Sequence, residues 1–201
     1  YPPAPAPPAG PGATPPPPGH GWAGGYPAPP VPLSPGGQPL ARFEQRLLAF
    51  LLDGLILGAV SLVLVVPIYF CGILLLLQPV TTVNGEVIDG ATGVRMLVTV
   101  LALMAVVFVL SAALSYVYHV ELPLRSGGQT YGKRIMKLRV VPLNPAETIT
   151  RRHLGLRFLV QAGMGYAGVS LLDGLWQLWD KPYQQCLHDK AAKTVVVRLT
   201  P

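Results

Sequence analysis

Two long apolar segments constrain this chain more than any other feature of its sequence. Within 47–77 the only formally charged residue is Asp53, and 96–118 contains no charge at all. At 1.5 Å per residue, a helix over 47–70 is about 36 Å long, which exceeds the roughly 30 Å hydrocarbon core of a bilayer. Charged residues make up 12% of the chain, about half the share in a soluble domain. We therefore expect transmembrane helices over about 47–70 and 96–118.

A third apolar segment, 158–179, is weaker because polar residues and glycines interrupt it. Basic residues flank it on both sides, so the positive-inside rule favours both of its ends in the cytoplasm. A broken or re-entrant hairpin that turns near 163–168 satisfies this rule, and a single tilted span is the alternative. Alternation at 135–141 and the valine run at 194–199 predict a short cytoplasmic β-ribbon. The expected fold is an all-α membrane protein, a small transmembrane helix bundle that carries this ribbon.

The first 40 residues differ in composition from the rest of the chain. They hold 16 of the 23 prolines, 8 of the 22 glycines and no Asp, Glu, Lys or Arg. Such a segment cannot bury a core, because it has few large apolar side chains and a high entropic cost of ordering. We expect residues 1–40 to be a disordered tether and residues 41–199 to form the membrane domain. Docking of the proline runs in an aromatic groove of a partner is the alternative.

The placement of Lys and Arg predicts how the chain is oriented in a cell membrane that it crosses more than once. Ten basic residues lie within 41–46 and 121–157. The loop 78–93 contains no Lys or Arg, and its only charged residues are one Glu and one Asp. The positive-inside rule therefore places the N-terminal arm in the cytoplasm and this loop outside. Because the basic residues lie beside membrane helices, we expect them to bind anionic lipid headgroups, at about 1 kcal/mol each, rather than nucleic acid. The headgroup candidates are Lys133, Arg134, Lys137 and Arg139.

Asp53 is the residue of the first apolar helix whose chemistry most needs an explanation. A charge near the centre of a membrane helix costs about 2.5–3.5 kcal/mol on insertion scales, so Asp53 should face the protein interior and have a partner. Arg46 lies seven residues earlier on the same helix face. It is too far away for direct contact, and another cation should pair with Asp53. Such a pair either fixes helix packing or binds an ion or a proton.

Three segments around the apolar helices resemble a known family. The first is 46–54, Arg-Leu-Leu-Ala-Phe-Leu-Leu-Asp-Gly; the second, 128–141, begins Gly-Gln-Thr-Tyr-Gly-Lys; the third, 188–197, begins His-Asp-Lys-Ala-Ala-Lys-Thr. In this order they resemble the RDD family of membrane proteins over roughly residues 40–199. The resemblance implies cation/proton exchange or other transport, as proposed for some members. It maps the defining arginine and two aspartates of the family onto Arg46, Asp53 and Asp189.

The remaining polar residues indicate no enzyme site. His188 and Asp173 are secondary polar candidates, and Asp173 lies near enough to the end of its segment to reach water. One His beside one Asp supplies too few ligands for a metal, and 128–133 lacks the spacing of a phosphate-binding loop. Cys186 and His188, two residues apart, would point away from each other on a helix. We therefore expect no enzymatic activity, no cofactor and no metal.

Two functions compete for a chain of this kind. The first is a non-enzymatic assembly or scaffold subunit, which binds a second copy or another membrane protein through the arm and the glycine-rich third segment. The second is a cation/proton transporter. With so few spans, a transport path within one protomer is not expected, so a transporter would have to function as an oligomer.

The charge bias generates a prediction about sidedness. In a background without Cys71 and Cys186, a cysteine at Asn84 should react with an impermeant thiol reagent added to intact cells. A cysteine at Ser34 should react only after permeabilisation, because the arm is expected in the cytoplasm. A probe at Thr200 tests the third segment, since labelling in intact cells would require a single span. Labelling of the arm but not the loop in intact cells would show that the orientation is inverted.

Overall fold

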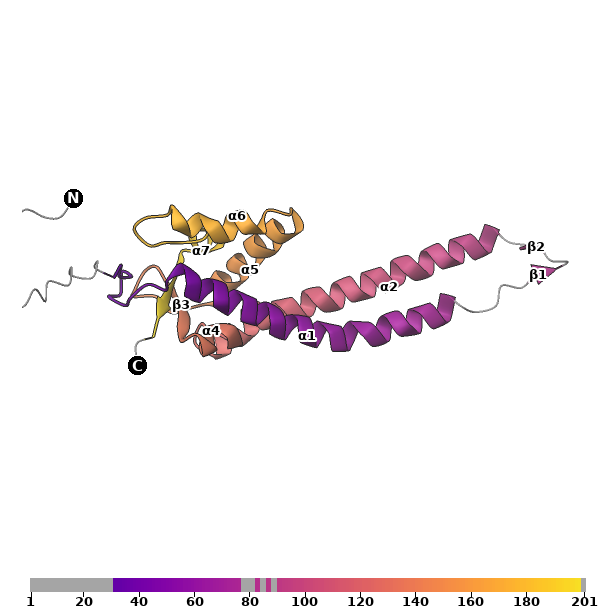
Figure 1. Cartoon of the computed structure of the whole chain (residues 1–201), viewed down its shortest axis with the longest axis horizontal. Coiled ribbons are helices and arrows are strands. Elements are labelled where there is room, and N and C mark those ends of the chain that lie inside the picture. The colour runs from indigo at the N-terminus through magenta and orange to yellow at the C-terminus, as the bar shows by residue number, and fades with distance from the viewer. Residues whose placement is uncertain (1–30, 77–81, 84–85, 88–89, 200–201) are drawn as a thin grey trace, which may run out of the picture. The chain divides into compact units, whose positions relative to one another are not determined.

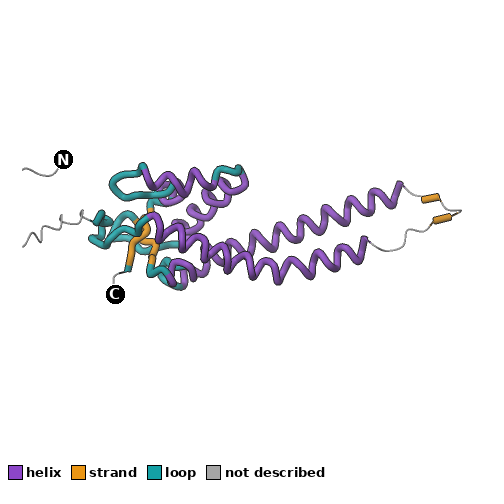
Figure 2. The backbone as a smooth tube through the Cα atoms, viewed as in Figure 1, coloured by secondary structure: helices purple, strands orange, loops and turns teal. Residues whose placement is uncertain are grey.

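The computed structural model describes residues 31–76, 82–83, 86–87 and 90–199 (Figure 1). The chain divides into two compact units, 1–30 and 31–201, and the described elements belong to the second. Most of the expected disordered arm therefore lies outside the described residues, as do the probe positions Asn84 and Thr200. The second unit is mostly helical and contains a small two-stranded antiparallel sheet, β3 with β4 (Figure 2).

Two long apolar helices run side by side (Figure 1). Helix α1 (Phe43–Leu76) includes Pro67 without ending there. Helix α2 (Gly90–Tyr116) continues through the π-helical turn η1 (Val117–Glu121) into α3 (Leu122–Arg125). In the described part of the chain, two helical stretches, 43–76 and 93–125, are long and apolar enough to cross a membrane. Both extend beyond the 47–70 and 96–118 expected from the apolar runs.

The two long helices approach each other closely at a glycine. Gly72 of α1 is buried, and a Cβ there would lie 2.3 Å from Cδ1 of Leu103 on α2. A side chain at this position would therefore require the Leu103 side chain to shift. Beyond α1 the chain forms the short antiparallel strands β1 (Thr82–Val83) and β2 (Glu86–Val87) before α2 begins.

The apolar segment 158–179 is not one helix. It begins within α5 (Arg151–Tyr166), turns, and continues as α6 (Ser170–Leu175) and the 3₁₀ turn η2 (Trp176–Leu178). Gly168 in the turn has φ +74°, a left-handed conformation that glycine adopts at little cost. The amide of Val169 donates to the carbonyl of Met164 at 2.9 Å and closes the turn. The chain is thus broken near the glycines rather than continuous.

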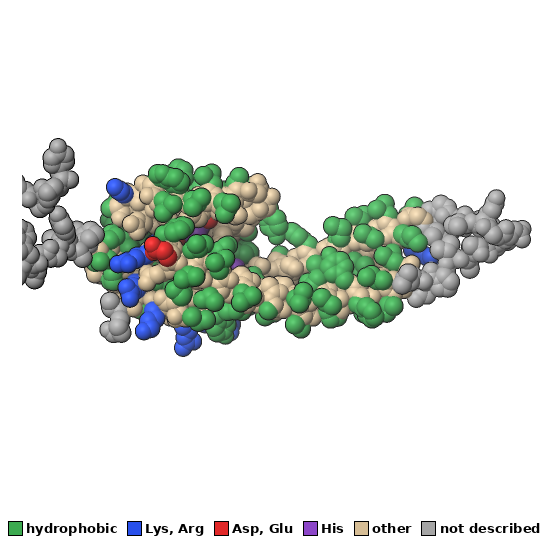
Figure 3. All heavy atoms as spheres, in the orientation of Figure 1, with side chains coloured by type: hydrophobic (Ala, Val, Ile, Leu, Met, Phe, Trp, Pro, Cys, Tyr) green, Lys and Arg blue, Asp and Glu red, His purple; other side chains and the backbone are tan. Residues whose placement is uncertain are grey.

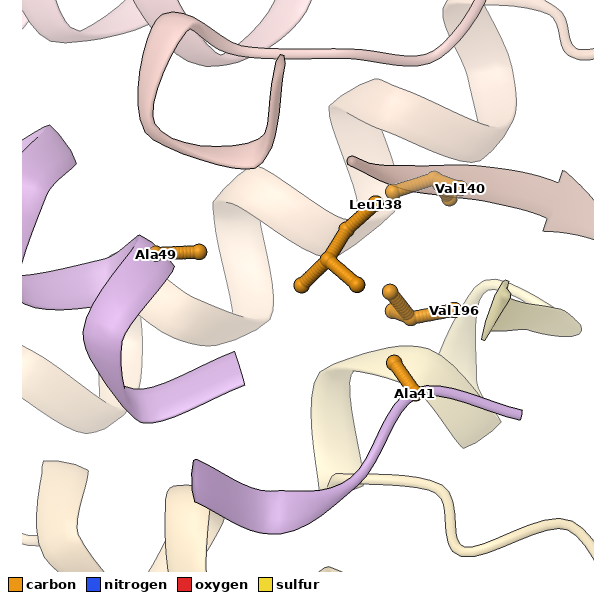
Figure 4. Packing of buried hydrophobic residues seen from close by; sticks show 5 residues of the cluster. All are labelled: Ala41, Ala49, Leu138, Val140 and Val196. Carbon is orange, nitrogen blue, oxygen red and sulfur yellow. The ribbon is translucent and has the colours of Figure 1, made fainter. Parts of the chain in front are cut away.

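The small sheet pairs two strands that lie far apart in the sequence. Strand β3 (Leu138–Pro142) follows α4 (Tyr131–Ile135), and β4 (Thr194–Arg198) follows α7 (Leu187–Ala191). The strands are antiparallel, with Val140 opposite Val196, which confirms the expected ribbon, although β3 begins three residues later than predicted. Its apolar face packs against the start of α1 in a cluster of five buried side chains (Figure 4), namely Ala41, Ala49, Leu138, Val140 and Val196.

The last ten residues of the expected arm pack against the sheet. The amide of Arg198 donates to the carbonyl of Pro39 at 2.8 Å, and the amide of Ala41 donates to the carbonyl of Val196 at 3.0 Å. Leu40 is buried. The edge of β4 needs backbone partners and Leu40 needs cover, so this segment is part of the fold. Ser34 is also buried, and the exposed Gln38 is the better position for the arm probe.

Candidate functional site

The carboxylate of Asp53 is buried in the interior and fully hydrogen bonded. The side chain is 3% exposed. Its Oδ1 accepts hydrogen bonds from the Tyr118 hydroxyl at 2.6 Å and from the Gly132 amide at 2.7 Å. Its Oδ2 accepts one from the Thr130 hydroxyl at 2.6 Å, and Nζ of Lys133 lies 3.6 Å away. The cation that the sequence required is therefore Lys133, supported by two hydroxyls and a backbone amide.

Helix α4 presents its N-terminus to Asp53. Thr130 is the N-cap, and its hydroxyl accepts the amide of Lys133 at 3.4 Å while donating to the carboxylate. Free amides at a helix start favour an anion. Gly132 permits the close approach, because a Cβ there would lie 2.4 Å from the Ala49 carbonyl oxygen and 2.7 Å from Oδ1 of Asp53. The glycine is therefore required by the docking of α4 on α1.

A second buried carboxylate, Asp189, is bound by two arginines. It is 0% exposed. Nη1 of Arg46 lies 3.2 Å from Oδ2, and Nη1 of Arg157 contacts Oδ1. Oδ2 also accepts the amide of Cys186 at 3.3 Å, as the third residue of α7 does in a capping box. Burial favours the neutral acid, but Arg157, His188 and Arg46 outweigh it and lower the pKa of Asp189 to about 2.

The two arginines also tie this carboxylate to the sheet. Arg46 donates from Nη1 to the carbonyl of Gln184 at 2.8 Å and from Nη2 to the carbonyl of Val196 at 3.2 Å. Arg157 of α5 donates to the hydroxyl of Thr194 at 2.7 Å. Removing one partner of such a buried pair typically costs about 3–5 kcal/mol, because the other charge is left without compensation. The network thus joins α1, α5, α7 and β4.

Asp173 belongs to the interior and not to the water-accessible end of its segment. It is 4% exposed; Oδ1 accepts the amide of His188 at 2.9 Å and Oδ2 lies 2.6 Å from Nδ1 of the same residue. The expectation that Asp173 reaches water was therefore wrong, because α6 folds back onto α7. Nε2 of His188 lies 3.4 Å from Asp189, so this imidazole bridges the two carboxylates.

Cys186 and His188 also lie closer together than expected. Cys186 is the N-cap and not a helical residue, and the ligand atoms of Cys186, His188 and Asp189 lie within 4.8 Å of one another. Both oxygens of Asp189 already bind arginines. Burial raises the pKa of the Cys186 thiol to about 12, and a protonated thiol is a weak ligand. This geometry does not favour a cation.

Two helix–strand units, α4–β3 and α7–β4, dock on α1 and repeat one local design. In the first, Nε2 of Gln129 donates to the carbonyl of Leu138 at 2.7 Å; in the second, Nε2 of Gln185 donates to the carbonyl of Thr194 at 2.8 Å. Each bond spans nine residues and joins the residue before the N-cap of a short helix to the start of the following strand. The two strands are entered through residues with positive φ, Lys137 at 54° and Lys193 at 51°.

The repeated units carry opposite charges at the equivalent helical position. Lys133 is the third residue of α4 and pairs with Asp53. Asp189 is the third residue of α7 and pairs with Arg46. Because Arg46 and Asp53 lie on one face of α1, two turns apart, each unit finds a partner of the opposite sign. Charge complementarity therefore specifies that α4 binds at Asp53 and that α7 binds at Arg46.

The basic residues predicted at lipid headgroups do not form one group. Lys133 is half-buried beside Asp53, and burial lowers its pKa despite the opposing effect of Asp53. Arg134 and Lys137 are exposed, and Arg139 is half-buried. On the face shown in Figure 3, most Lys and Arg side chains lie over the end where β3 and the start of α1 meet. Lys133 is thus a partner of Asp53, and the other three remain headgroup candidates.

Three residues of the site were not recognised as such from the sequence. Arg157 is one of the basic residues expected at lipid headgroups, Tyr118 is only the last residue of the second apolar segment, and Thr130 lies in the segment 128–133 that lacks the spacing of a phosphate-binding loop. Arg157 carried a local signal, because it shares a helix face with the buried Leu154. Tyr118 and Thr130 gave none, because their hydroxyls meet Asp53 only through contacts across 65 and 77 residues.

Comparison with known proteins adds one finding. The family model described as "RDD family" matches residues 40–193, which include both carboxylate sites. No curated protein and no solved structure matches the chain.

The close approach at Gly132 yields a prediction about stability. We expect Gly132→Ala to lower the unfolding free energy by about 1–3 kcal/mol, since the new methyl group overlaps Ala49 and Asp53. Gly155→Ala is the matched control, because Gly155 also lies within a helix, α5, and has open space where its Cβ would lie. Thermal melting of the full chain in detergent should show a loss for the first variant and no loss for the second. Equal melting temperatures would contradict the docking of α4 on Asp53.

Proposed function

The chain belongs to the RDD family, and from this premise we propose that it is a non-enzymatic membrane assembly or scaffold subunit. Its two membrane-capable helices agree with a membrane protein. The observation that carries the proposal is the distribution of charge. The buried acidic and basic residues form closed pairs that hold the start of α1 to the head region, defined as residues 122–199.

Charged side chains do not continue along α1 beyond Asp53. After Asp53, residues 54–76 of α1 contain no acidic, basic or histidine residue. On α2 the hydroxyl of Thr99 donates to the carbonyl of Arg95 in its own helix at 2.8 Å. Ions need a continuous series of polar groups to cross the apolar half of a membrane protein. Structural pairing of charges therefore accounts for the site better than conduction does.

The apolar surfaces of α1 provide the contact surface that an assembly subunit needs. Leu62 and Val63 are exposed, and Gly54 and Gly58 both have open space where a Cβ would lie. In a bilayer, small residues four apart on a helix let a second helix approach closely. The partner is a second copy or another membrane protein, which would cover this glycine face.

The arm and the head region complete the proposal on the cytoplasmic side. The positive-inside bias supports that orientation. The exposed Arg134 and Lys137 suit anionic headgroups at the inner surface. The proline-rich N-terminal arm would then lie on the cytoplasmic side.

A cation/proton transporter that functions as an oligomer is the second candidate, and one observation favours it. Lys133, Arg157 and Gln161 line two neighbouring cavities, one that also contains His188 and one that also contains His119. Polar groups thus connect the two cavities within the head region. A second copy would have to supply the rest of the path past residue 54.

An ion-flux measurement separates these functions. We expect vesicles that contain the full chain to hold a proton or sodium gradient as long as empty vesicles do, at several pH values, because residues 54–76 of α1 contain no charged side chain. The matched variant is Asp53→Asn, with folding checked by thermal melting. Flux that is present in the natural chain and absent in a folded Asp53→Asn variant would favour the transporter.

Association in the membrane is the second test. We expect energy transfer between donor- and acceptor-labelled copies in vesicles, and we expect Gly58→Leu to reduce it severalfold because the larger side chain blocks close helix approach. Gly155→Leu is the control, since Gly155 of α5 lies outside the glycine-rich segment 158–179 and also has open space at its Cβ position. Energy transfer without any effect of Gly58→Leu would contradict this contact face. If the natural chain shows no energy transfer, the partner would be another membrane protein and not a second copy.

A further inference from the structure

A pocket of about 190 Å³ lies between the start of α1 and the segment formed by α6 and α7. In Figure 1 these short helices lie beside the N-terminal part of α1. Polar residues line part of the pocket, here called its floor. They include Arg46, Lys133, Arg157, Gln161 and His188. Its volume is below the roughly 300–1,000 Å³ of sites that enclose a drug-sized ligand. It therefore has room for a small polar group and not for a whole membrane lipid.

The floor of this pocket has more hydrogen-bond donors than acceptors. Both oxygens of Asp173 and both oxygens of Asp189 are already bonded. Arg157 is 8% exposed and uses only Nη1, so its Nε and Nη2 have no hydrogen bond within the described residues. A guanidinium carries five N–H donors, and these two nitrogens are not among the fully buried atoms of the described residues that lack a partner. Arg157 therefore has donors to offer to a further acceptor in the pocket.

Two further donors show the same surplus. Nε of Arg46 is buried and has no hydrogen-bond partner among the described residues. In that same part of the chain the side-chain amide of Gln161 makes no hydrogen bond, although it lines the pocket. The lining carries three cations, Arg46, Lys133 and Arg157, and two carboxylates, and the charge of Lys133 is already matched by Asp53. An anionic oxygen group, such as a phosphate or a carboxylate, would supply acceptors for Arg157 and Gln161 in the pocket.

The mouth of the pocket is apolar. Leu47 and Phe50 of α1 and Leu171 and Leu175 of α6 line it, and Leu171 is 78% exposed. These side chains continue the exposed apolar surface of α1, which includes Leu51 and Leu55. A hydrocarbon chain that leaves the pocket would therefore lie along apolar side chains.

We propose that this pocket binds the anionic headgroup of a membrane amphiphile, with the hydrocarbon tail outside against α1 and α6. The arginines and Lys133 hold the anionic oxygens, and the leucines and Phe50 hold the first carbons of the tail. A free inorganic anion uses the floor but gains nothing from the apolar mouth. A metal cation fits poorly, because the positive side chains repel it. The site is distinct from the surface headgroup candidates Arg134 and Lys137, and it does not rest on the scaffold proposal.

Native mass spectrometry of the full chain in a neutral detergent tests this site. The probes are phosphatidylglycerol and phosphatidylcholine with identical acyl chains. We expect one phosphatidylglycerol to be retained in preference to phosphatidylcholine. Gly174→Leu should weaken that retention at least about tenfold, because Gly174 lines the pocket and its Cβ position is open. Gly163→Leu, whose glycine has the same open space on α5, should retain the lipid as the natural chain does.

A second pair of variants keeps the test decisive if Gly174→Leu does not fold. Leu171→Asp places a negative charge at the mouth, and Leu172→Asp places it on an adjacent exposed residue that does not line the pocket. Selective loss with Leu171→Asp supports the proposal. Equal retention in all variants, or equal retention of the two lipids, overturns it. Displacement of the lipid by inorganic phosphate at equal concentration also overturns it, because the tail would then contribute nothing.

Discussion

Two opposite charges on one apolar helix determine how the rest of this protein is arranged. Arg46 and Asp53 lie on one face of α1, and neither can be left unpaired in an apolar surrounding. Their partners come from segments far along the chain, Lys133 for Asp53 and Asp189 for Arg46. The short helices and the small sheet therefore gather around the start of α1. The second half of α1 has no such demand and contacts mainly α2.

The way the charges are matched explains why this arrangement is unique. The units α4–β3 and α7–β4 share a short helix, a lysine with positive φ and a glutamine bond across nine residues. Such similar units would exchange places on α1 if only apolar packing held them. The opposite charges of Lys133 and Asp189 prevent this, because exchange would place like charges together. Arg157 adds a second guanidinium to one site only, which makes the two sites different.

The same pairing bears on function. Charges that are closed within the protein stabilise a rigid head region, and they leave few groups for moving ions. The exceptions are the donors of Arg157 and Gln161, which line the pocket beside α6. A scaffold that binds an anionic amphiphile at this point would have its stability linked to the lipid around it, because a ligand that binds the folded state stabilises it.

Composition and periodicity along the sequence determined the two membrane-capable helices, the two valine-containing strands and the need of Asp53 for a partner, because each depends on the residues themselves and their near neighbours. The tertiary structure decided which partners meet. Arg157, Tyr118 and Thr130 reach the carboxylates only through long-range contacts, and residues 31–40 join the fold only because the edge of β4 is free to bind them. Local patterns cannot specify such contacts, since they depend on how distant segments pack together in space.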